Sequence, residues 1–461
     1  MTRSSSASLL VALLAAVLVS SCSDDDRRRP DVVLVIADTL RADRLRAQGG
    51  PDGLTPYMDR LAEGGVRFAQ ARSHAPWTLP STASLLTSLH PLEHGAGGNV
   101  ETFTRLRDGV PTLAQSFRDA GYDTHAVVNV TFLDPETFGV TRDFDSVDNV
   151  SFQSNVDVRD ARATTAAALE WLDARETQDR PAFLLVHYFD PHCVYAPPPS
   201  FREQWAAPED RESTWTFGTR AQMIAIRDGT YAPDAATLVR AEHLYEGEVA
   251  YLDAEVGRLA AGLEERGLFG EGSVFALTGD HGEEFGDHGG FEHGHTLYDE
   301  LLHVPLFVRA PGALEPDVVE APVRLIDVAP TLLELCDLPR VPTFVGRSLV
   351  PLARGEDDAP RPTFAHGNMW GAPQSAWISG SWKLVEREGA PPMLFDLARD
   401  PEELRDVAAE ETERLAELQD EANAVARAMR ALASGDAAEL DEATRDRLRG
   451  FGYGKSKGPR D

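Results

Sequence analysis

The chain alternates between apolar runs and amphipathic stretches. The apolar runs are rich in Val, Ile, Leu and Phe and lack polar alternation, which predicts strands buried on both faces of a parallel sheet. Five such strands are expected, at Val32–Ala37, Thr124–Val130, Ala182–Phe189, Val274–Thr278 and Val304–Arg309.

Amphipathic segments between these runs predict helices. They cover Leu54–Gly64, Thr112–Ala120, Ala161–Arg175, Leu238–Arg266 and Val323–Cys336. The alternation of strands and helices predicts an α/β fold with a mostly parallel central sheet flanked by helices on both faces.

The pattern changes in two places. Residues 196–237 are rich in Pro, Trp and charged residues, which predicts a long insertion that forms a lid, a substrate wall or a disordered segment.

Beyond Pro351, short strands and a polar helix predict a small α+β subdomain. We therefore expect a catalytic α/β domain at 31–350, a C-terminal subdomain at 351–449 and a flexible tail at 450–461. The subdomain elements are expected at Gln374–Ile378, Trp382–Val385, Met393–Asp396 and Pro401–Ala433.

The N-terminal segment, 1–22, has the features of a targeting signal. Leu9–Val19 is apolar but too short to cross a membrane comfortably. Val19-Ser20-Ser21-Cys22 resembles a bacterial lipoprotein processing site. An ordinary cleaved signal peptide and an uncleaved anchor are the alternatives. We predict lipidation of Cys22 and a polar tether at 23–30. The mature protein would then be an extracytoplasmic lipoprotein held at a membrane, either periplasmic or at the cell surface.

The charge composition of the chain indicates which classes of partner it can bind. The 461 residues carry 44 Lys and Arg against 75 Asp and Glu, a net charge of −31. We therefore predict no nucleic-acid partner, because phosphates would be repelled. Hydrophobic residues at 42% and charged residues at 26% are ordinary for a globular protein.

Two predicted strands end in groups that bind metals. Asp38 closes the first strand, and Asp280-His281 closes SVFALTGDH. In open α/β sheets ligands bind beyond the carboxyl ends of strands, and carboxylates with an imidazole suit a divalent cation. This pattern predicts a metal-assisted ester hydrolase.

Thr78 lies between these strands in sequence, ahead of a segment that predicts a helix. Pro80 suits a first helical turn, so Thr78 would sit near a helix N-terminus, where backbone N–H groups stabilise anions. Beside a metal its hydroxyl could attack phosphorus or sulfur. The alternative is that Thr78 is only the N-cap of this helix.

Several motifs in order resemble the sulfatase family, within the alkaline-phosphatase-like superfamily. The similarity runs from Pro30 to about Ala409. It includes DVVLVIADTLRADRL, TPYMDRLAEGGVRF, TLPSTASLLTS, GYDTHAVVN, HYFDPHCVY, GDHGEEFGDHG, HGHTLYDELLHVPLFV and MLFDLARDPEELRDVA. The resemblance implies the alkaline-phosphatase/sulfatase-like sandwich for the α/β domain.

The resemblance also implies a metal site. Asp38, Asp280 and His281 would be ligands of one divalent ion, and the Thr78 side chain would complete the shell. Family members often carry a second Asp after the first, where this chain has Thr39. The identity of the ion stays open among Ca, Mg, Mn and Zn.

The nucleophile departs from the family pattern. Sulfatases oxidise a Cys or Ser in C/S-x-P-S-R to formylglycine, whereas this chain has Thr78 there and Thr82 in place of Arg. A secondary alcohol cannot give that aldehyde. Thr nucleophiles occur in relatives that handle phosphodiesters, so we predict direct attack by Thr78.

Other residues are assigned by the same resemblance. His192 would contact the leaving group and donate a proton to it. His293 and His295 lie where the family contacts the ester oxygens, and the choice between them stays open. Arg41 and Asn129 are the remaining substrate-binding candidates, with Asn129 near the place of the missing Gly-Lys pair.

These assignments predict a hydrolase of anionic sulfate or phosphate esters. The family favours sulfate, whereas the Thr nucleophile favours phosphate mono- or diesters. The alternatives are a transferase that passes a phospho-alcohol group to a glycan or lipid, and a binding lipoprotein that has lost catalysis.

Overall fold

The computed structural model describes residues 28–149, 158–430 and 437–450. The predicted signal peptide with Cys22, most of the tether and residues 451–461 of the predicted tail lie outside the described residues. No helix among the described residues has both the length and the apolar character needed to cross a membrane.

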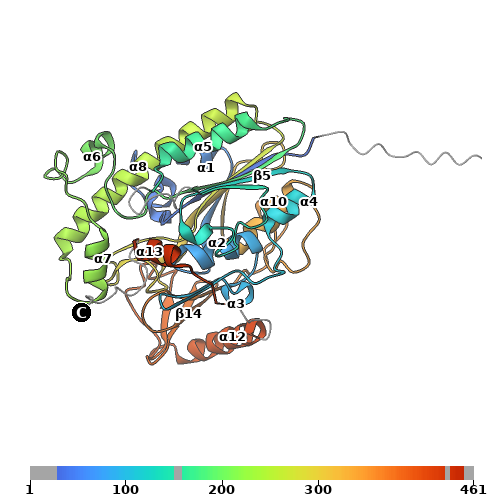
Figure 1. The fold of residues 1–461 in the computed structure, drawn as a ribbon. Helices are drawn as coiled ribbons and strands as arrows, with labels where there is room; N and C mark the ends of the chain where they lie inside the picture. Colours follow the sequence, from blue (N-terminus) through green and yellow to red (C-terminus); the bar gives the residue numbers. More distant parts are fainter. Residues whose placement is uncertain (1–27, 150–157, 431–436, 451–461) are drawn as a thin grey trace, which may run out of the picture.

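An eight-stranded central sheet forms the middle layer of the main domain (Figure 1). All of its strands run in one direction except β11, which is antiparallel to both of its neighbours. The five predicted strands are all present, because each apolar run is buried in the middle of this sheet. In spatial order the strands are β12 (Asp317–Arg324), β2 (Val66–Arg72), β11 (His303–Arg309), β8 (Ser273–Gly279), β1 (Asp31–Ala37), β7 (Ala182–Tyr188), β5 (Asp123–Val128) and β6 (Ser146–Asn149).

Helices cover both faces of the sheet, so the predicted fold class is confirmed (Figure 1). One apolar layer buries the side chains of three helices, α1 (Pro56–Glu63), α5 (Ala161–Ala174) and the long α8 (Ala235–Glu265). The opposite layer buries α2 (Thr78–Thr87), α4 (Leu113–Asp119) and α10 (Val328–Leu335).

Three sequence predictions need correction. The segment Val323–Cys336 is not one helix, because its first residues complete edge strand β12 and α10 begins only at Val328. Strand β2 was not predicted, because polar and apolar side chains are mixed along it, with its positions either buried or half-buried. Of the three alternatives for the insertion 196–237, only disorder is contradicted, since the segment contains α6 (Pro199–Trp205), α7 (Arg220–Arg227) and the start of α8.

The C-terminal subdomain is a four-stranded antiparallel sheet with one long helix packed on it (Figure 1). The sheet has the order β13 (Thr363–His366), β14 (Gln374–Ser379), β15 (Trp382–Arg387) and β16 (Met393–Asp396). The helix, α12 (Thr412–Arg430), begins well after the expected Pro401, because the residues before it form turns.

Short elements complete the described chain. They are β3 (Gly97–Asn99), β4 (Thr102–Thr104), β9 (Glu284–Phe285), β10 (Phe291–Glu292), α3 (Pro91–His94), α9 (Asp299–Leu302), α11 (Val350–Ala353) and α13 (Glu442–Gly450).

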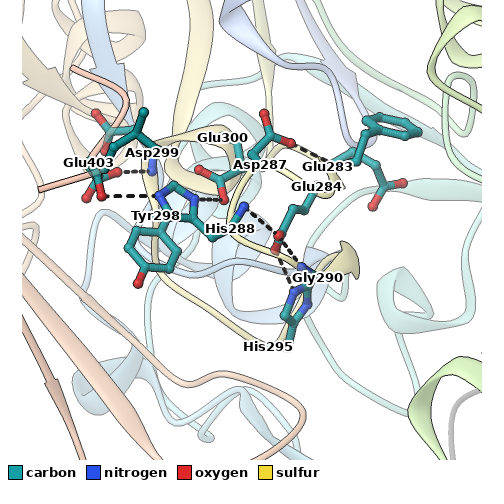
Figure 2. Close-up of polar contacts among 12 residues, drawn as sticks. Glu283, Glu284, Asp287, His288, Gly290, His295, Tyr298, Asp299, Glu300 and Glu403 are labelled. Atoms are coloured by element: carbon teal, nitrogen blue, oxygen red, sulfur yellow. Dashed lines mark hydrogen bonds and ion pairs between the residues drawn. The ribbon is translucent and has the colours of Figure 1, made fainter. Parts of the chain in front are cut away.

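A buried ion-pair cluster joins the subdomain to the main domain. Lys383 of β15 is fully buried and pairs with Asp299 and Glu403, each 2.8 Å away. Asp299 also pairs with Arg72 of the central sheet at 2.8 Å. Figure 2 shows Asp299 beside Glu403, with His288 contacting Glu300 and the Glu403 backbone. Because each buried charge has a partner, the cluster fixes the subdomain against the strand ends of the sheet.

Candidate active site

The centre of the site is set by the pairing of two strands. Strands β1 and β8 are adjacent and parallel, with Ala37 opposite Gly279. Asp38 and Asp280 therefore leave the sheet side by side at its carboxyl edge, followed by His281. One ligand atom from each of these three residues lies within 4.8 Å of the others, and all three side chains are fully buried.

Thr78 meets this group from the opposite direction. Helix α2 begins at Thr78, and its N-cap residue is Trp77, so the N-cap interpretation of Thr78 is wrong. Thr78 Oγ1 lies 3.5 Å from Asp38 Oδ1 and 3.3 Å from His281 Nε2. The Ser81 hydroxyl on the same helix donates to the Asp280 carbonyl at 2.6 Å. This bond ties the start of α2 to the end of β8, which fixes Thr78 beside the two carboxylates.

The electrostatics of the group are strongly coupled. Burial and the neighbouring Asp38 raise the pKa of Asp280 to about 7, since both disfavour its charged form. Burial alone would lower the pKa of His281, but Asp280 and Asp38 raise it to about 9. Burial opposes ionisation of Asp38 as well, yet the contact with His281 holds its pKa below the usual range. A positive charge next to Asp38 and Asp280 therefore stabilises the charged forms of these two carboxylates.

The donor set fits a divalent cation. Asp38 Oδ2 and Asp280 Oδ2 are buried, and neither has a hydrogen-bond partner within the part of the chain that the structure describes. Leaving carboxylate oxygens unpaired in the interior is costly, and an ion between them would remove that cost. Two carboxylates, an imidazole and a hydroxyl suit Mg, Mn or Zn better than Ca, which favours more oxygen ligands.

Thr39 helps to hold Asp280 in position. Its φ of 58° places a β-branched residue in the left-handed region, which is costly in backbone energy. That conformation aims the Thr39 N–H at Asp280 Oδ1, 3.3 Å away, while its carbonyl accepts from the Tyr245 hydroxyl at 2.8 Å. The strained backbone thus supplies one of the two donors to the inner oxygen of Asp280; the other is the His281 N–H at 2.9 Å.

His187 belongs to the site but was not predicted. It lies in β7, next to β1, and its Nε2 is 3.7 Å from Asp38 Oδ2. Burial lowers the pKa of His187 to about 4, so the ring is neutral at neutral pH. The signal that could have found it is its position one residue before the end of a buried strand adjacent to Asp38.

The structure separates the two histidines that the sequence left open. His293 is buried, with its ring centroid 4.5 Å from that of His281 and 5.0 Å from that of His192. Its Nδ1 is 2.8 Å from Glu283 Oε1. His295 instead contacts Glu284 Oε2 at 2.7 Å and lines a different cavity (Figure 2). The placement of His295 therefore speaks against the substrate role predicted for it.

His192 lies where the resemblance put it. It lines the same small pocket as Asp38 and Thr78. Its Nδ1 donates to the Cys193 carbonyl at 2.7 Å. The ring also borders a cleft of about 450 Å³, next to Phe189.

Arg41 and Asn129 are placed outside the group around Thr78. The Arg41 guanidinium pairs with Asp43 at 2.8 Å and Asp287 at 3.0 Å, which satisfies its charge. The Asn129 amide is fully buried and donates to Thr164 Oγ1 and the His187 carbonyl, while its oxygen accepts from Arg159. Their polar atoms are committed to these internal contacts, so neither residue is kept as a substrate ligand.

Comparison with known proteins places the chain in a family of hydrolases. The family model described as Sulfatase matches residues 30–338, about two thirds of the chain. A second model, N-sulphoglucosamine sulphohydrolase, C-terminal, matches residues 286–429. The chain therefore belongs to the sulfatase family, whose members hydrolyse sulfate and related esters.

Individual relatives are distant but cover most of the chain. An arylsulfatase of Clostridium perfringens is 25% identical, over 81% of this chain and 89% of its own. A steryl-sulfatase of Mus musculus is 27% identical, over 87% and 82%. Among solved structures, a phosphonate monoester hydrolase of Agrobacterium radiobacter superposes with a TM-score of 0.68 and 22% identity, over 90% of this chain and 98% of its own. A complex with D-glucosamine-2-N,6-O-disulfate superposes with a TM-score of 0.72 and 19% identity, over 90% and 100%.

Metal binding is predicted to stabilise the protein. Adding Mg, Mn or Zn to chelator-treated protein should raise its Tm, because a ligand at about 100 times its Kd stabilises the folded state by about 2.7 kcal/mol. The shift should shrink strongly in Asp280→Asn, which removes one carboxylate, and persist in Asp287→Asn, whose carboxylate pairs with Arg41. Differential scanning fluorimetry measures both. An equal shift in Asp280→Asn, or none in the wild type, would contradict the site.

The two histidines are predicted to differ in their effect on activity. His293→Gln should lower kcat/KM by about 100-fold or more, the size expected for losing a positioned acid–base or hydrogen-bonding group. His295→Gln should stay close to wild type, because its ring contacts Glu284 away from Thr78. Steady-state kinetics with aryl sulfates and aryl phosphodiesters test this order, with circular dichroism confirming the fold. Equal losses of kcat/KM in His293→Gln and His295→Gln would contradict the different roles inferred from the positions of the two side chains.

Proposed function

We propose that this protein is a metal-dependent hydrolase of sulfate or phosphate esters in which Thr78 attacks sulfur or phosphorus directly. The observation that carries this proposal is the position of Thr78 Oγ1, 3.5 Å from Asp38 and 3.3 Å from His281 at the start of a buried helix. A hydroxyl used only for helix capping or packing would have no reason to meet two potential metal ligands.

The reaction follows from these positions. Thr78 Oγ1 forms a bond to the sulfur or phosphorus, its proton passes to the Asp38 carboxylate 3.5 Å away, and the ester bond to the leaving alcohol breaks. A divalent ion held by Asp38, Thr78, Asp280 and His281 would lower the pKa of the hydroxyl and offset negative charge on the ester. The backbone N–H groups in the first turn of α2 favour an anion at the same place. Water then attacks the Thr78 ester, the proton held by Asp38 returns to Thr78 Oγ1, and the product leaves as sulfate, a phosphate monoester or a phosphonate, according to the substrate.

The surroundings of His192 support its role toward the leaving group. The cleft of about 450 Å³ shares Phe189 and His192 with the pocket that holds Thr78. An alcohol bound in this cleft would place its oxygen next to His192. With Nδ1 donating to the Cys193 carbonyl, protonated Nε2 would give its proton to that oxygen as the bond breaks.

The charge of the site favours esters with one negative charge. No Lys or Arg lines the Thr78 pocket among the described residues. The whole chain has three lysines, and Lys383 is committed to Asp299 and Glu403. The carboxylates of Asp38 and Asp280 already neutralise the charge of a divalent ion bound between them. The second negative charge of a phosphate monoester would therefore gain little electrostatic stabilisation. Aryl sulfates, phosphodiesters and phosphonate monoesters fit better, and these include the substrate types named for the arylsulfatase and phosphonate monoester hydrolase relatives.

Substitution of the nucleophile tests the mechanism. Thr78→Ala should reduce turnover of 4-nitrophenyl sulfate and methyl 4-nitrophenyl phosphate to background, whereas Thr78→Ser should keep part of it because the hydroxyl remains. Tm and circular dichroism should show that both variants fold. A purified, folded Thr78→Ala enzyme that still turns over either ester would refute the role of Thr78.

We also propose that the protein is an extracytoplasmic bacterial lipoprotein with its lipid on Cys22. The support is the sequence Val19-Ser20-Ser21-Cys22 after a short apolar stretch, the order that a processed lipoprotein signal has. Metabolic labelling with an alkyne fatty acid should mark the wild type and not Cys22→Ser. Equal labelling of both, or a mature wild type without lipid on Cys22, would overturn the proposal.

A further inference from the structure

The last described helix lies over the nucleophile. Leu448 of α13 (Glu442–Gly450) lines the small pocket that also contains Asp38, Thr78 and His192. Figure 1 shows α13 close to α2, and α13 contacts the turn Thr131–Leu133 on the pocket wall. Both family models end before this helix, the second at residue 429. The part of the chain that matches the family therefore does not provide this wall.

The segment before α13 is built to reach this position. The Ala438 N–H donates to the Phe103 carbonyl at 2.9 Å, and Ala437 forms a β-bridge with Thr104. Leu440 packs on the apolar layer that covers α2. Asp441 then caps the helix, accepting from the Thr444 N–H at 2.6 Å. The helix thus starts from a fixed point beside the pocket.

Helix α13 buries few of its side chains. Of its described side chains, Thr444 and Leu448 are buried, one helical turn apart, and the others are partly or fully exposed. Leu448 is 2% exposed. With Leu448 in place the cavity beside Thr78 has a volume of about 10 Å³. That volume is room for about one water molecule.

A tetrahedral ester group needs more room than this cavity gives. The other apolar walls, Val130, Phe132 and Phe189, come from the core or from the loop after strand β7. Close packing there resists displacement. Leu448 is the wall residue that stands on a short helix with two buried side chains among those described. Its displacement therefore decides how large a group can reach Thr78.

We propose that α13 is a size-selective cap and that Leu448 is a specificity-determining residue for the substituent carried by the attacked sulfur or phosphorus. The inference rests on the proposed function of Thr78. Esters whose attacked atom carries only oxygens or a methyl group pass with a small retreat of Leu448. Esters that carry an aryl substituent there collide with it.

A matched pair of substrates isolates this effect. 4-Nitrophenyl methylphosphonate and 4-nitrophenyl phenylphosphonate share the leaving group and the single negative charge, and they differ only in the substituent on phosphorus. Leu448→Ala should raise the ratio of kcat/KM for the phenyl over the methyl substrate by about tenfold or more, since pockets discriminate by about 10–200-fold for small changes in fit. Leu448→Met, which conserves volume, should keep the wild-type ratio.

Leu440→Ala is the control for a general loosening of the C-terminal segment. It removes a side chain from the same apolar layer but not from the pocket. In Leu440→Ala the ratio of kcat/KM for the phenyl over the methyl substrate should stay at the wild-type value, even if the Tm of this variant falls. A ratio in Leu448→Ala that is unchanged within about twofold, or an equal change in Leu440→Ala, would overturn the proposal.

A second readout needs no turnover. In a Cys193→Ser background, Thr78→Cys places a thiol at the nucleophile position, and its labelling is followed by mass spectrometry with the Thr78 parent as blank. Leu448→Ala should speed labelling by a bulky aryl maleimide much more than labelling by methyl methanethiosulfonate. Equal acceleration of both reagents, or none, would refute the cap. If this assay succeeds while no ester is hydrolysed by the wild type, the proposed function fails and the cap stands.

Discussion

Two buried carboxylates, brought together by one parallel strand pair, determine the arrangement of the site. The register of β1 against β8 leaves Asp38 and Asp280 adjacent, with no freedom to move apart. Two negative charges in the protein interior repel each other strongly, so the surrounding structure has to offset them. The pair raises the pKa of His281, the Thr39 N–H donates to one oxygen of Asp280, and the outer oxygen of each carboxylate has no hydrogen-bond partner among the described residues.

The position of Thr78, the proposed nucleophile, depends on the same pair. Helix α2 is buried along its whole length and is bonded through Ser81 to the backbone of Asp280. Thr78 therefore meets the carboxylates because the helix is fixed to the strand that carries one of them. His293, held by Glu283, closes the group on the side of His192. A rigid scaffold of this kind suits a reaction that needs the attacking and leaving groups in fixed positions.

The sequence predicted the parts of the molecule that follow from local patterns. Apolar runs without polar alternation predicted the central strands. The polar residues at the ends of two of these strands, Asp38, Asp280 and His281, were predicted as metal ligands. It missed β2, whose side chains are only partly buried, and it merged β12 with α10, because an edge strand and a helix start look alike in a short apolar segment. The sequence did not reveal the internal contacts of Arg41 and Asn129, because most of their ion-pair and hydrogen-bond partners lie far away in sequence. His187 and Leu448 were missed for the same reason, since tertiary packing alone brings them to the site.

In the proposed mechanism, Thr78 would give the protein a different chemical route from formylglycine sulfatases within the same fold. The loss of the motif Arg, replaced by Thr82, and the absence of lysines from the described pocket wall agree with a substrate group of single charge. The C-terminal helix adds a wall beyond the family-matched part of the chain. Substrate choice would then depend on two properties of the ester. Its charge would matter at the proposed metal site, and the size of the substituent on its attacked atom would matter at Leu448.

Direct attack by Thr78 is the central claim, and trapping the covalent intermediate tests it most directly. The enzyme is mixed with excess 4-nitrophenyl methylphosphonate, quenched in acid within milliseconds and digested for peptide mass mapping. The account predicts a methylphosphonyl group on Thr78, in the peptide that contains TLPSTASLLTS, which decays at the rate of turnover. Turnover without any such adduct, or an adduct on another residue, would contradict it.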